Sequence, residues 1–232
     1  MTASTSPALM ALLDGLFADA EVTSKAFMAE FEKYSPAERD AMMTTKDYKG
    51  FYGRAKDVHL PVSRETGKLL YMLARSSGAH SIVEFGTSFG ISTLHMAAAL
   101  RDNGGGRLIS TEFEPSKVAR ARQTIAAAGF SDLVEIREGD ALETLSRDLP
   151  DVIDLVLLDG AKALYPDVLA LLEPCLRPGA FILADNANWS PEYLSRVRMA
   201  GGDYISVPFP DDVELSMRVA PANGGADSAP VH

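Results

Sequence analysis

The sequence predicts an α/β protein whose core is a doubly wound, mostly parallel sheet of seven strands. From Ser81 onward, short apolar stretches alternate strictly with stretches of helical periodicity. The apolar stretches show little polar alternation, which is typical of strands that helices cover on both faces. The last two stretches have no helix between them, so they are expected to pair as an antiparallel hairpin at one edge of the sheet.

Each element of the alternating part has a predicted place on the chain. Strands are predicted over residues 81–85, 106–111, 133–138, 153–159, 179–185, 204–209 and 213–219. The intervening helices are predicted over residues 91–100, 115–128, 141–147, 165–176 and 191–200.

The chain divides into three segments. Residues 1–60 are expected to form helices, because apolar residues recur there at helical spacing and Ser35 with Glu38 forms a capping box. Residues 61–219 are expected to form the α/β domain. Residues 220–232 are small and rich in Gly and Pro, so they are expected to be a disordered tail.

The composition is that of a globular domain with one sizeable core. Of 232 residues, 47% are hydrophobic and 23% are charged, and the net charge is −10. This acidity opposes a nucleic-acid surface, which needs clustered Lys and Arg. No apolar run approaches membrane-spanning length, and the N-terminus lacks a signal-peptide pattern. The single cysteine, Cys175, is expected to be a buried apolar residue. These features favour a cytoplasmic location.

The stretch VEFGTSFGIST, from Val83, joins the first predicted strand to a helix. In doubly wound sheets, ligands bind beyond the carboxyl ends of the strands, where this turn lies. Gly86 allows the backbone to approach a ligand, and Gly90 allows close packing of helix and strand. The dinucleotide pattern G-x-G-x-x-G is absent, because Ser88 stands at its second glycine, and Glu84 would repel a pyrophosphate. The turn therefore suits a ligand with an ammonium group; a turn without a ligand is the alternative.

The second and third predicted strands end in further candidate ligand groups. Glu112 lies at the tip of the second strand, where a carboxylate can accept both hydroxyls of a ribose, and Phe113 beside it can cover an adenine face. Asp140 follows the third strand, with Glu143 as its partner in a capping box. A solvated strand end and a structural cap are the alternatives. The acids and turns occur in the order that S-adenosylmethionine requires.

Polar side chains also follow the fourth and fifth predicted strands. Asp159 ends the fourth, and Asp185 and Asn186 end the fifth. Since neighbouring strands lie about 4.8 Å apart, these oxygens are expected to converge. Two carboxylates and an amide oxygen are hard ligands suited to Mg²⁺, Mn²⁺ or Ca²⁺. Capping of the following helices is the alternative.

With these stretches in order, the chain resembles the small metal-dependent O-methyltransferases of the catechol and caffeoyl-coenzyme A type. The resemblance covers about residues 50–218, and the ordered set is specific although each motif alone is weak. The motifs are LPVSRETGKLL, VEFGTSFGIST, TEFEP, GDALETL, LLDGAKALYPDVL and LADNANW. The resemblance implies a Rossmann-like methyltransferase fold that uses S-adenosylmethionine and a divalent metal, with Mg²⁺ first and Mn²⁺ or Ca²⁺ as alternatives.

The resemblance also implies a role for individual residues. Asp159, Asp185 and Asn186 would hold the metal, and Lys162 would lie beside the reacting hydroxyl, with Asp159 sharing its catalytic role. Position in the glycine turn and at the second strand end adds Ser88 and Phe113 to the donor site. The residues that the resemblance places near the methyl donor are Val62, Glu84, Gly86, Ser92, Glu112, Ala141 and Asp159.

The chain departs from the family pattern at two places. Animal catechol enzymes carry a substrate-binding glutamate just before the final strand, where this chain has Pro208 with Asp211 and Asp212 nearby. Bulky residues follow the metal-binding aspartate in those relatives, where this chain has Gly160 and Ala161. A different and wider substrate pocket is therefore expected, and specificity for simple catechols is open.

The predicted reaction is attack of a substrate oxygen on the sulfonium methyl group. Three protein oxygens leave an octahedral ion enough positions for two vicinal substrate oxygens, which favours a catechol-like acceptor. Lys162 would take the proton if the metal and burial depress its pKa; a surface lysine is the alternative. Tyr165 is expected to pack in its helix and His59 to be structural, while Trp189 either walls the pocket or covers its loop.

Other functions stay open at this point. A metal-independent methyltransferase and a non-catalytic S-adenosylmethionine-binding protein would use the same fold. A nicotinamide dehydrogenase is opposed by Glu84 and by the missing glycine. No nucleic-acid or membrane partner is expected. The N-terminal helices carry more apolar residues than one small sheet domain needs, so a homodimer with these helices at or near the interface is expected.

Overall fold

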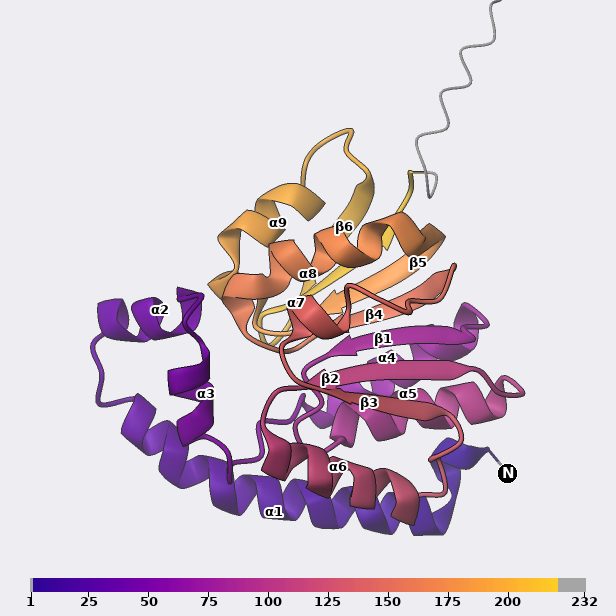
Figure 1. Ribbon diagram of the computed structural model, residues 1–232, viewed down its shortest axis with the longest axis horizontal. Helices are drawn as coiled ribbons and strands as arrows, with labels where there is room; N and C mark the ends of the chain where they lie inside the picture. Colours follow the sequence, from indigo (N-terminus) through magenta and orange to yellow (C-terminus); the bar gives the residue numbers. More distant parts are fainter. Residues whose placement is uncertain (1, 221–232) are drawn as a thin grey trace, which may run out of the picture.

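A single seven-stranded sheet forms the centre of the computed structural model, which describes residues 2–220 (Figure 1). Its strands are β1 (Ser81–Phe85), β2 (Arg107–Glu112), β3 (Val134–Glu138), β4 (Ile153–Leu158), β5 (Leu176–Ala184), β6 (Tyr204–Phe209) and β7 (Val213–Arg218). Their order is β3-β2-β1-β4-β5-β7-β6, and only the last two run antiparallel to their neighbours. The expected tail lies, apart from its first residue, outside the described residues.

Helices cover both faces of the sheet. The helices are α1 (Pro7–Phe31), α2 (Pro36–Thr44), α3 (Lys49–Arg54), α4 (Arg64–Ser76), α5 (Ile91–Asp102), α6 (Pro115–Ala127), α7 (Ala141–Thr144), α8 (Tyr165–Leu172) and α9 (Pro191–Val197), with short 3₁₀ turns η1 (Ala3–Thr5), η2 (Lys162–Leu164), η3 (Glu173–Cys175) and η4 (Ala187–Trp189). Helices α1, α4, α5 and α6 lie on one face and α7, α8 and α9 on the other (Figure 1). Each face has its own apolar core. No helix within residues 2–220 combines the length and the hydropathy needed to cross a membrane.

The doubly wound sheet and its antiparallel final hairpin are confirmed. The hairpin turns through Asp211 and Asp212, whose φ angles of 62° and 58° are those of the mirror-image turns that suit the twist of paired strands. Helix boundaries are less well predicted. The helix expected over residues 165–176 ends at Leu172, where Pro174 lies in a 3₁₀ turn and cannot donate a helical hydrogen bond.

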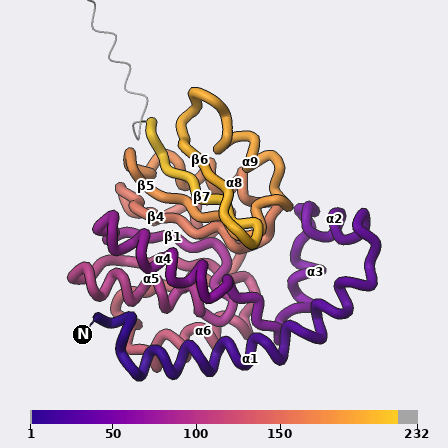
Figure 2. Tube along the Cα trace, turned by 180° about the vertical axis from the view of Figure 1, so that it is seen from behind, coloured from indigo at the N-terminus to yellow at the C-terminus, as the bar shows by residue number. Residues whose placement is uncertain are grey.

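The N-terminal helices lie beside the domain and end at the carboxyl rim of the sheet (Figure 2). Leu9 and Leu13 of α1 are buried in the core of the α4/α5 face. Farther along, the Phe51 ring of α3 contacts the rings of Phe27 and Phe31 of α1, with centroids 5.9 and 5.8 Å apart. The predicted capping box at the start of α2 is present. These contacts hold α3 beside the strand ends.

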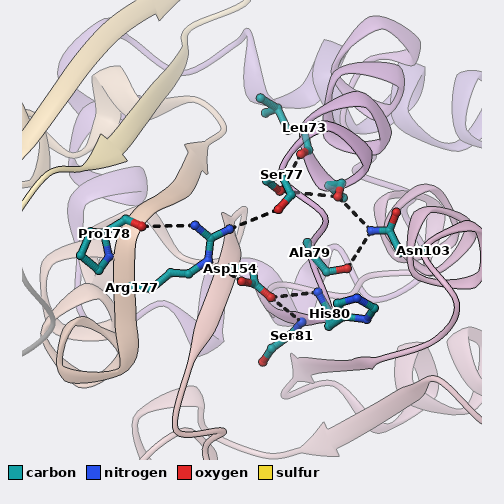
Figure 3. A network of polar contacts seen from close by, with 10 residues as sticks. Leu73, Ser77, Ala79, His80, Ser81, Asn103, Asp154, Arg177 and Pro178 are labelled. Carbon is teal, nitrogen blue, oxygen red and sulfur yellow. Dashed lines mark hydrogen bonds and ion pairs between the residues drawn. The ribbon is translucent and has the colours of Figure 1, made fainter.

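A polar network fastens the opposite, amino rim of the sheet (Figure 3). The Asp154 carboxylate, in β4, accepts the backbone N–H groups of His80 at 2.8 Å and Ser81 at 2.9 Å, and the Arg177 Nε–H at 2.6 Å. Burial alone would raise the pKa of Asp154, but the guanidinium and the two N–H groups lower it below its usual value. Arg177 also donates to the carbonyl oxygen of Ser77 at 3.4 Å. The amino ends of β1, β4 and β5 are thereby fixed to one another.

Candidate active site

A pocket lies at the carboxyl ends of β1, β2 and β4, the edge of a doubly wound sheet at which ligands bind. Tyr48 and Tyr52 add a wall from α3 and the residue before it. A smaller recess adjoins the pocket and includes His59 and Ser92. The pocket is lined by Tyr48, Tyr52, Leu60, Phe85, Gly86, Ser88, Thr111, Glu112, Phe113, Glu114, Lys117, Gly139, Ala141, Asp159, Gly160 and Ala161.

The turn after β1 is shaped by positive φ angles. Gly86 has a φ of +103°, and a Cβ there would lie 2.6 Å from the backbone oxygen of Asp159, so the turn presses against the end of β4. Gly90 has a φ of +89°, but a Cβ there would meet nothing closer than 3.9 Å. Its backbone angle, and not close packing, is what requires glycine. The Ser88 N–H donates to Glu112 Oε2 at 2.9 Å, which joins the turn to the end of β2.

The Glu84 carboxylate is fully buried beneath this turn. It accepts hydrogen bonds from the hydroxyls of Ser92 at 2.5 Å, Thr93 at 2.6 Å and Ser110 at 2.5 Å. Burial raises its pKa to about 7, although the three hydroxyl donors act in the opposite direction. Among the described residues that line the pocket and its recess, Glu84 does not occur. Its carboxylate braces the turn from inside.

Glu112 and Phe113 line the pocket at the end of β2. The two Glu112 oxygens each accept one backbone N–H, from Ser88 at 2.9 Å and from Glu114 at 3.0 Å. Each oxygen keeps a second lone pair for another donor. Burial raises the Glu112 pKa, and the N–H donors and the nearby Lys117 lower it in part. A rigid carboxylate with free acceptor sites beside an aromatic ring suits a nucleoside.

Asp140 joins α3 to the end of β3. Its side chain caps α7 through the N–H of Leu142 at 3.0 Å, and it also accepts the Tyr48 hydroxyl at 3.0 Å and the Lys49 ammonium at 3.1 Å. Tyr48 in turn packs edge-on against Phe113, with ring centroids 5.5 Å apart. Asp140 thus caps α7 through Leu142, without the reciprocal capping box that was predicted with Glu143, and also anchors the N-terminal wall of the pocket.

A buried charged cluster occupies the ends of β4 and β5. Lys162 Nζ lies 3.0 Å from Asp159 Oδ1 and donates to the Tyr165 hydroxyl at 2.8 Å. That hydroxyl donates to the backbone oxygen of Asp185 at 2.7 Å. The Lys162 side chain is only 4% exposed, which excludes the surface-lysine alternative. Tyr165, expected only to pack, holds Lys162 and the end of β5 together.

The pKa values of this cluster reflect its crowded charges. Burial acts to lower the pKa of Lys162, but Tyr165 and the carboxylates of Asp159 and Asp185 outweigh it and raise that pKa well above its ordinary value. Burial alone therefore does not depress the Lys162 pKa, because the ammonium is ion-paired with Asp159. The depression expected from a metal and burial together stays a prediction. Burial, together with the charge of Asp159, raises the pKa of Asp185 to about 7, and Asp211 adds to the effect.

These residues fit a divalent cation. The charge of Asp159 acts on Asp185 across the ends of β4 and β5, an arrangement that like charges disfavour unless a cation lies between them. Asn186 follows directly, with a left-handed φ of 49° at the start of η4. Across residues 2–220, no group of three or more His, Cys, Asp or Glu side chains is gathered for a metal. The predicted set, with two carboxylates and the Asn186 amide oxygen, contains only two side chains of these types.

Gly160 does not widen the pocket. A Cβ on Gly160 would overlap the ring of Phe85, because that ring fills the space that a larger residue would take. Phe85 itself lines the pocket and lies edge-on to Tyr165, with ring centroids 6.2 Å apart. The expected widening is therefore wrong at this position. Pro208, the other departure, is exposed on the edge strand β6.

Comparison with known proteins identifies the family. Residues 83–187 match a methyltransferase domain. The catechol O-methyltransferase of Niastella koreensis is 37% identical over 130 residues, which cover 55% of this chain and 58% of the relative. The catechol O-methyltransferase of Sus scrofa is 33% identical over 155 residues, which cover 63% of this chain and 82% of the relative. The chain belongs to the catechol O-methyltransferase family.

The chain spans little more than half the length of the catechol O-methyltransferases of Niastella koreensis and Danio rerio. Among solved structures, the O-methyltransferase TomG from Streptomyces achromogenes, determined in complex with SAM, is 27% identical to this chain. Its TM-score is 0.62, and the match covers 81% of this chain and 91% of TomG. This chain therefore shares its fold with TomG, an O-methyltransferase whose structure contains SAM.

The structure brings most of the site residues that the family resemblance implied to one place. Asp159 lines the pocket, Lys162 is ion-paired with it, and its charge acts on Asp185. Val62 is buried, two residues after Leu60, which lines the pocket and the recess. His59 stacks on Phe89, with ring centroids 3.8 Å apart, in keeping with a structural role. Those that line the pocket or its recess are Gly86, Ser88, Ser92, Glu112, Phe113, Ala141 and Asp159.

Two pocket residues, Tyr48 and Tyr52, were missed by the sequence analysis. They stand four positions apart, the spacing that places side chains on one helical face. That spacing is a weak signal, because it says nothing about which part of the protein the face meets. Only the long-range packing of α3 on α1 and on Asp140 places these rings at the pocket.

Proposed function

We propose that the chain is an S-adenosylmethionine-dependent O-methyltransferase. The observation that supports this most is one pocket that is lined by both the rigid Glu112 carboxylate and Asp159, whose carboxylate is ion-paired with the buried Lys162. The free lone pairs of Glu112 suit the two ribose hydroxyls, and Phe113 with Ala141 suits the adenine. The methionine part is assigned to the recess, where Glu84 lies beneath and contributes negative charge toward its ammonium; the assigned contacts are Val62, Gly86, Ser88, Ser92 and Asp159.

A divalent ion completes the proposed site, held by Asp159, Asp185 and Asn186. Mg²⁺ is the first choice because all three donors are oxygen atoms, and Mn²⁺ or Ca²⁺ are alternatives. Such an ion supplies positive charge that orients two vicinal oxygens of a catechol-like acceptor and favours ionisation of one of them. In the proposed transfer, the acceptor oxygen bonds to the methyl carbon, the carbon–sulfur bond breaks, and S-adenosylhomocysteine leaves as a neutral thioether.

Lys162 is the proposed proton acceptor. It can take a proton only as a neutral amine, and its contact with Asp159 favours the ammonium form. Proton transfer to Lys162 therefore requires that Asp159 be drawn to another positive charge. Tyr165 keeps the Lys162 nitrogen in place through its hydroxyl.

Methyl transfer to a panel of small catechols tests the proposal. Each acceptor is incubated with S-adenosylmethionine and the protein, with Mg²⁺ or with excess chelator. Transfer that depends on Mg²⁺ supports the full proposal. Binding of S-adenosylhomocysteine, with NAD as the control ligand, tests the donor site separately; preference for NAD would overturn the assignment.

Metal-independent methyl transfer is a second candidate function. One observation favours it, because Lys162 already neutralises part of the Asp159 charge without any metal. In that case the ammonium of Lys162, and not a metal ion, would stabilise the acceptor oxyanion. Undiminished transfer in chelator would select this candidate.

A homodimer is also proposed. The inner face of α1 is covered by the domain itself, but Met10, Val22 and Met28 are 52%, 76% and 44% exposed. The edge strand β6 exposes Ile205 and Val207 by 59% and 46%. Exposed apolar side chains on these two elements are candidate interface residues. Light scattering at micromolar concentration tests the proposal, and a monomeric mass would refute it.

A further inference from the structure

The Tyr52 hydroxyl is a buried polar group for which residues 2–220 provide no hydrogen-bond partner. Its side chain lines the same pocket as Glu112 and Asp159. A buried hydroxyl without a partner destabilises the fold, because it has lost water and gained nothing in return. A ligand oxygen in the pocket would satisfy it.

Tyr52 shares the pocket wall with Asp159, which belongs to the charged cluster. The charges of Lys162 and Asp159 both act on it, and Tyr52 acts on Lys162 in return. Burial raises the pKa of Tyr52, with a smaller opposing effect from Lys162. The phenol is therefore protonated at neutral pH and can donate a hydrogen bond as well as accept one.

Tyr52 is also held in position. The Phe51 ring beside it packs on two rings of α1, and its own ring lies edge-on to Phe51 with centroids 5.1 Å apart. Tyr48, at the start of the same helix, is tied to Asp140 through its hydroxyl, and Lys46 is ion-paired with Asp167 at 2.7 Å. Tyr52 is thus held in the pocket wall by an anchored helix.

We propose that Tyr52 is an acceptor-binding residue, whose hydroxyl hydrogen-bonds to an oxygen of the methyl acceptor other than the one that is methylated. The inference rests on the proposed methyltransferase function and adds a specificity determinant to it. The site then prefers acceptors that carry a second oxygen next to the reacting hydroxyl over otherwise equal monophenols. This preference for a second oxygen comes from Tyr52 in α3 and not from the charged cluster at the strand ends.

Tyr52→Phe tests the inference, with Tyr48→Phe as the matched control. Both variants remove one phenolic hydroxyl from the pocket wall, but only the Tyr48 hydroxyl has a protein partner. For catechol, Tyr52→Phe should lower kcat/KM about tenfold, mainly through KM. For phenol, which lacks the second oxygen, the same variant should change kcat/KM by less than about twofold. Tyr48→Phe should show no such dependence on the acceptor.

Two further measurements separate the possible failures. Affinity for S-adenosylhomocysteine should be equal in wild type and Tyr52→Phe; a loss would assign the hydroxyl to the donor and overturn the inference. Catechol is also titrated into protein saturated with S-adenosylhomocysteine and Mg²⁺. If wild type binds catechol more tightly than Tyr52→Phe but transfers no methyl group, the proposed function is refuted and the role of Tyr52 in binding is retained. Equal catechol binding and equal kinetics in both proteins, or no binding by either, would overturn the inference.

Discussion

Replacing Tyr165 with phenylalanine removes one buried hydroxyl from the charged cluster. That hydroxyl accepts a hydrogen bond from Lys162 at 2.8 Å and donates one to the Asp185 backbone oxygen at 2.7 Å. Losing a bond to a charged group costs about 1.5–3 kcal/mol, and leaving a buried carbonyl unsatisfied costs about 1–3 kcal/mol. The two losses share one hydroxyl and overlap, so we expect the free energy of unfolding to fall by about 3 kcal/mol.

Urea unfolding followed by circular dichroism measures this loss without donor, acceptor or metal. The midpoint should fall while the dependence on urea concentration stays the same, because the exposed surface is unchanged. Tyr52→Phe is the control, since its hydroxyl lacks a partner among the described residues and its removal should cost no stability. A loss below about 1 kcal/mol in Tyr165→Phe would refute the bridging role of the hydroxyl.

Three further predictions concern the acids of the site. Glu112→Ala should weaken S-adenosylhomocysteine binding by about 1–3 kcal/mol in calorimetry; unchanged affinity would refute the ribose assignment. Asp185→Ala should cut methyl transfer severely while leaving that affinity nearly intact, and an undiminished rate would remove the metal from the proposal. Burial raises the Glu84 pKa from 4.5 to about 7, so the folded state binds the proton more tightly than the unfolded chain. The stability that this adds is complete below pH 4.5 and is lost as the pH rises to 7. Glu84→Gln should therefore lose roughly 2.5 kcal/mol less than wild type between pH 5 and pH 8 in urea titrations, and parallel pH profiles would contradict the assignment.

The sheet was predictable because its signals are local. The apolar strands, the capping box of α2 and the N-cap Ser63 of α4 each follow from a few neighbouring residues. The meeting of Asp159 with Asp185 was predictable as well, since both follow strands whose order in a doubly wound sheet is limited. Those strand-end residues came from topology and required no knowledge of side-chain packing.

The missed features depend on packing between distant segments. The ring of Phe85 fills the space beside Gly160, and no local pattern connects the two. The Glu84 carboxylate faces three hydroxyls from α5 and β2, although its position in the motif suggested a ligand. The direction of the Lys162 pKa shift depends on whether burial or the neighbouring groups dominate, and the contacts of Lys162 with Tyr165 and Asp159 decide that.

The charges at the two rims of the sheet are balanced differently, as the Asp154 network shows for the amino rim. At the amino rim, one carboxylate is matched by two N–H groups and a guanidinium, so local and global preferences agree. At the carboxyl rim, Asp159, Asp185 and the buried Glu84 crowd together, and desolvation raises the pKa of the last two. The interactions at the amino rim therefore support one another, whereas the like charges at the carboxyl rim oppose one another. A cationic ligand that binds only the folded chain reduces the repulsion among these carboxylates. The carboxyl rim, which lowers the stability of the protein by itself, is therefore the place where such a ligand can raise it.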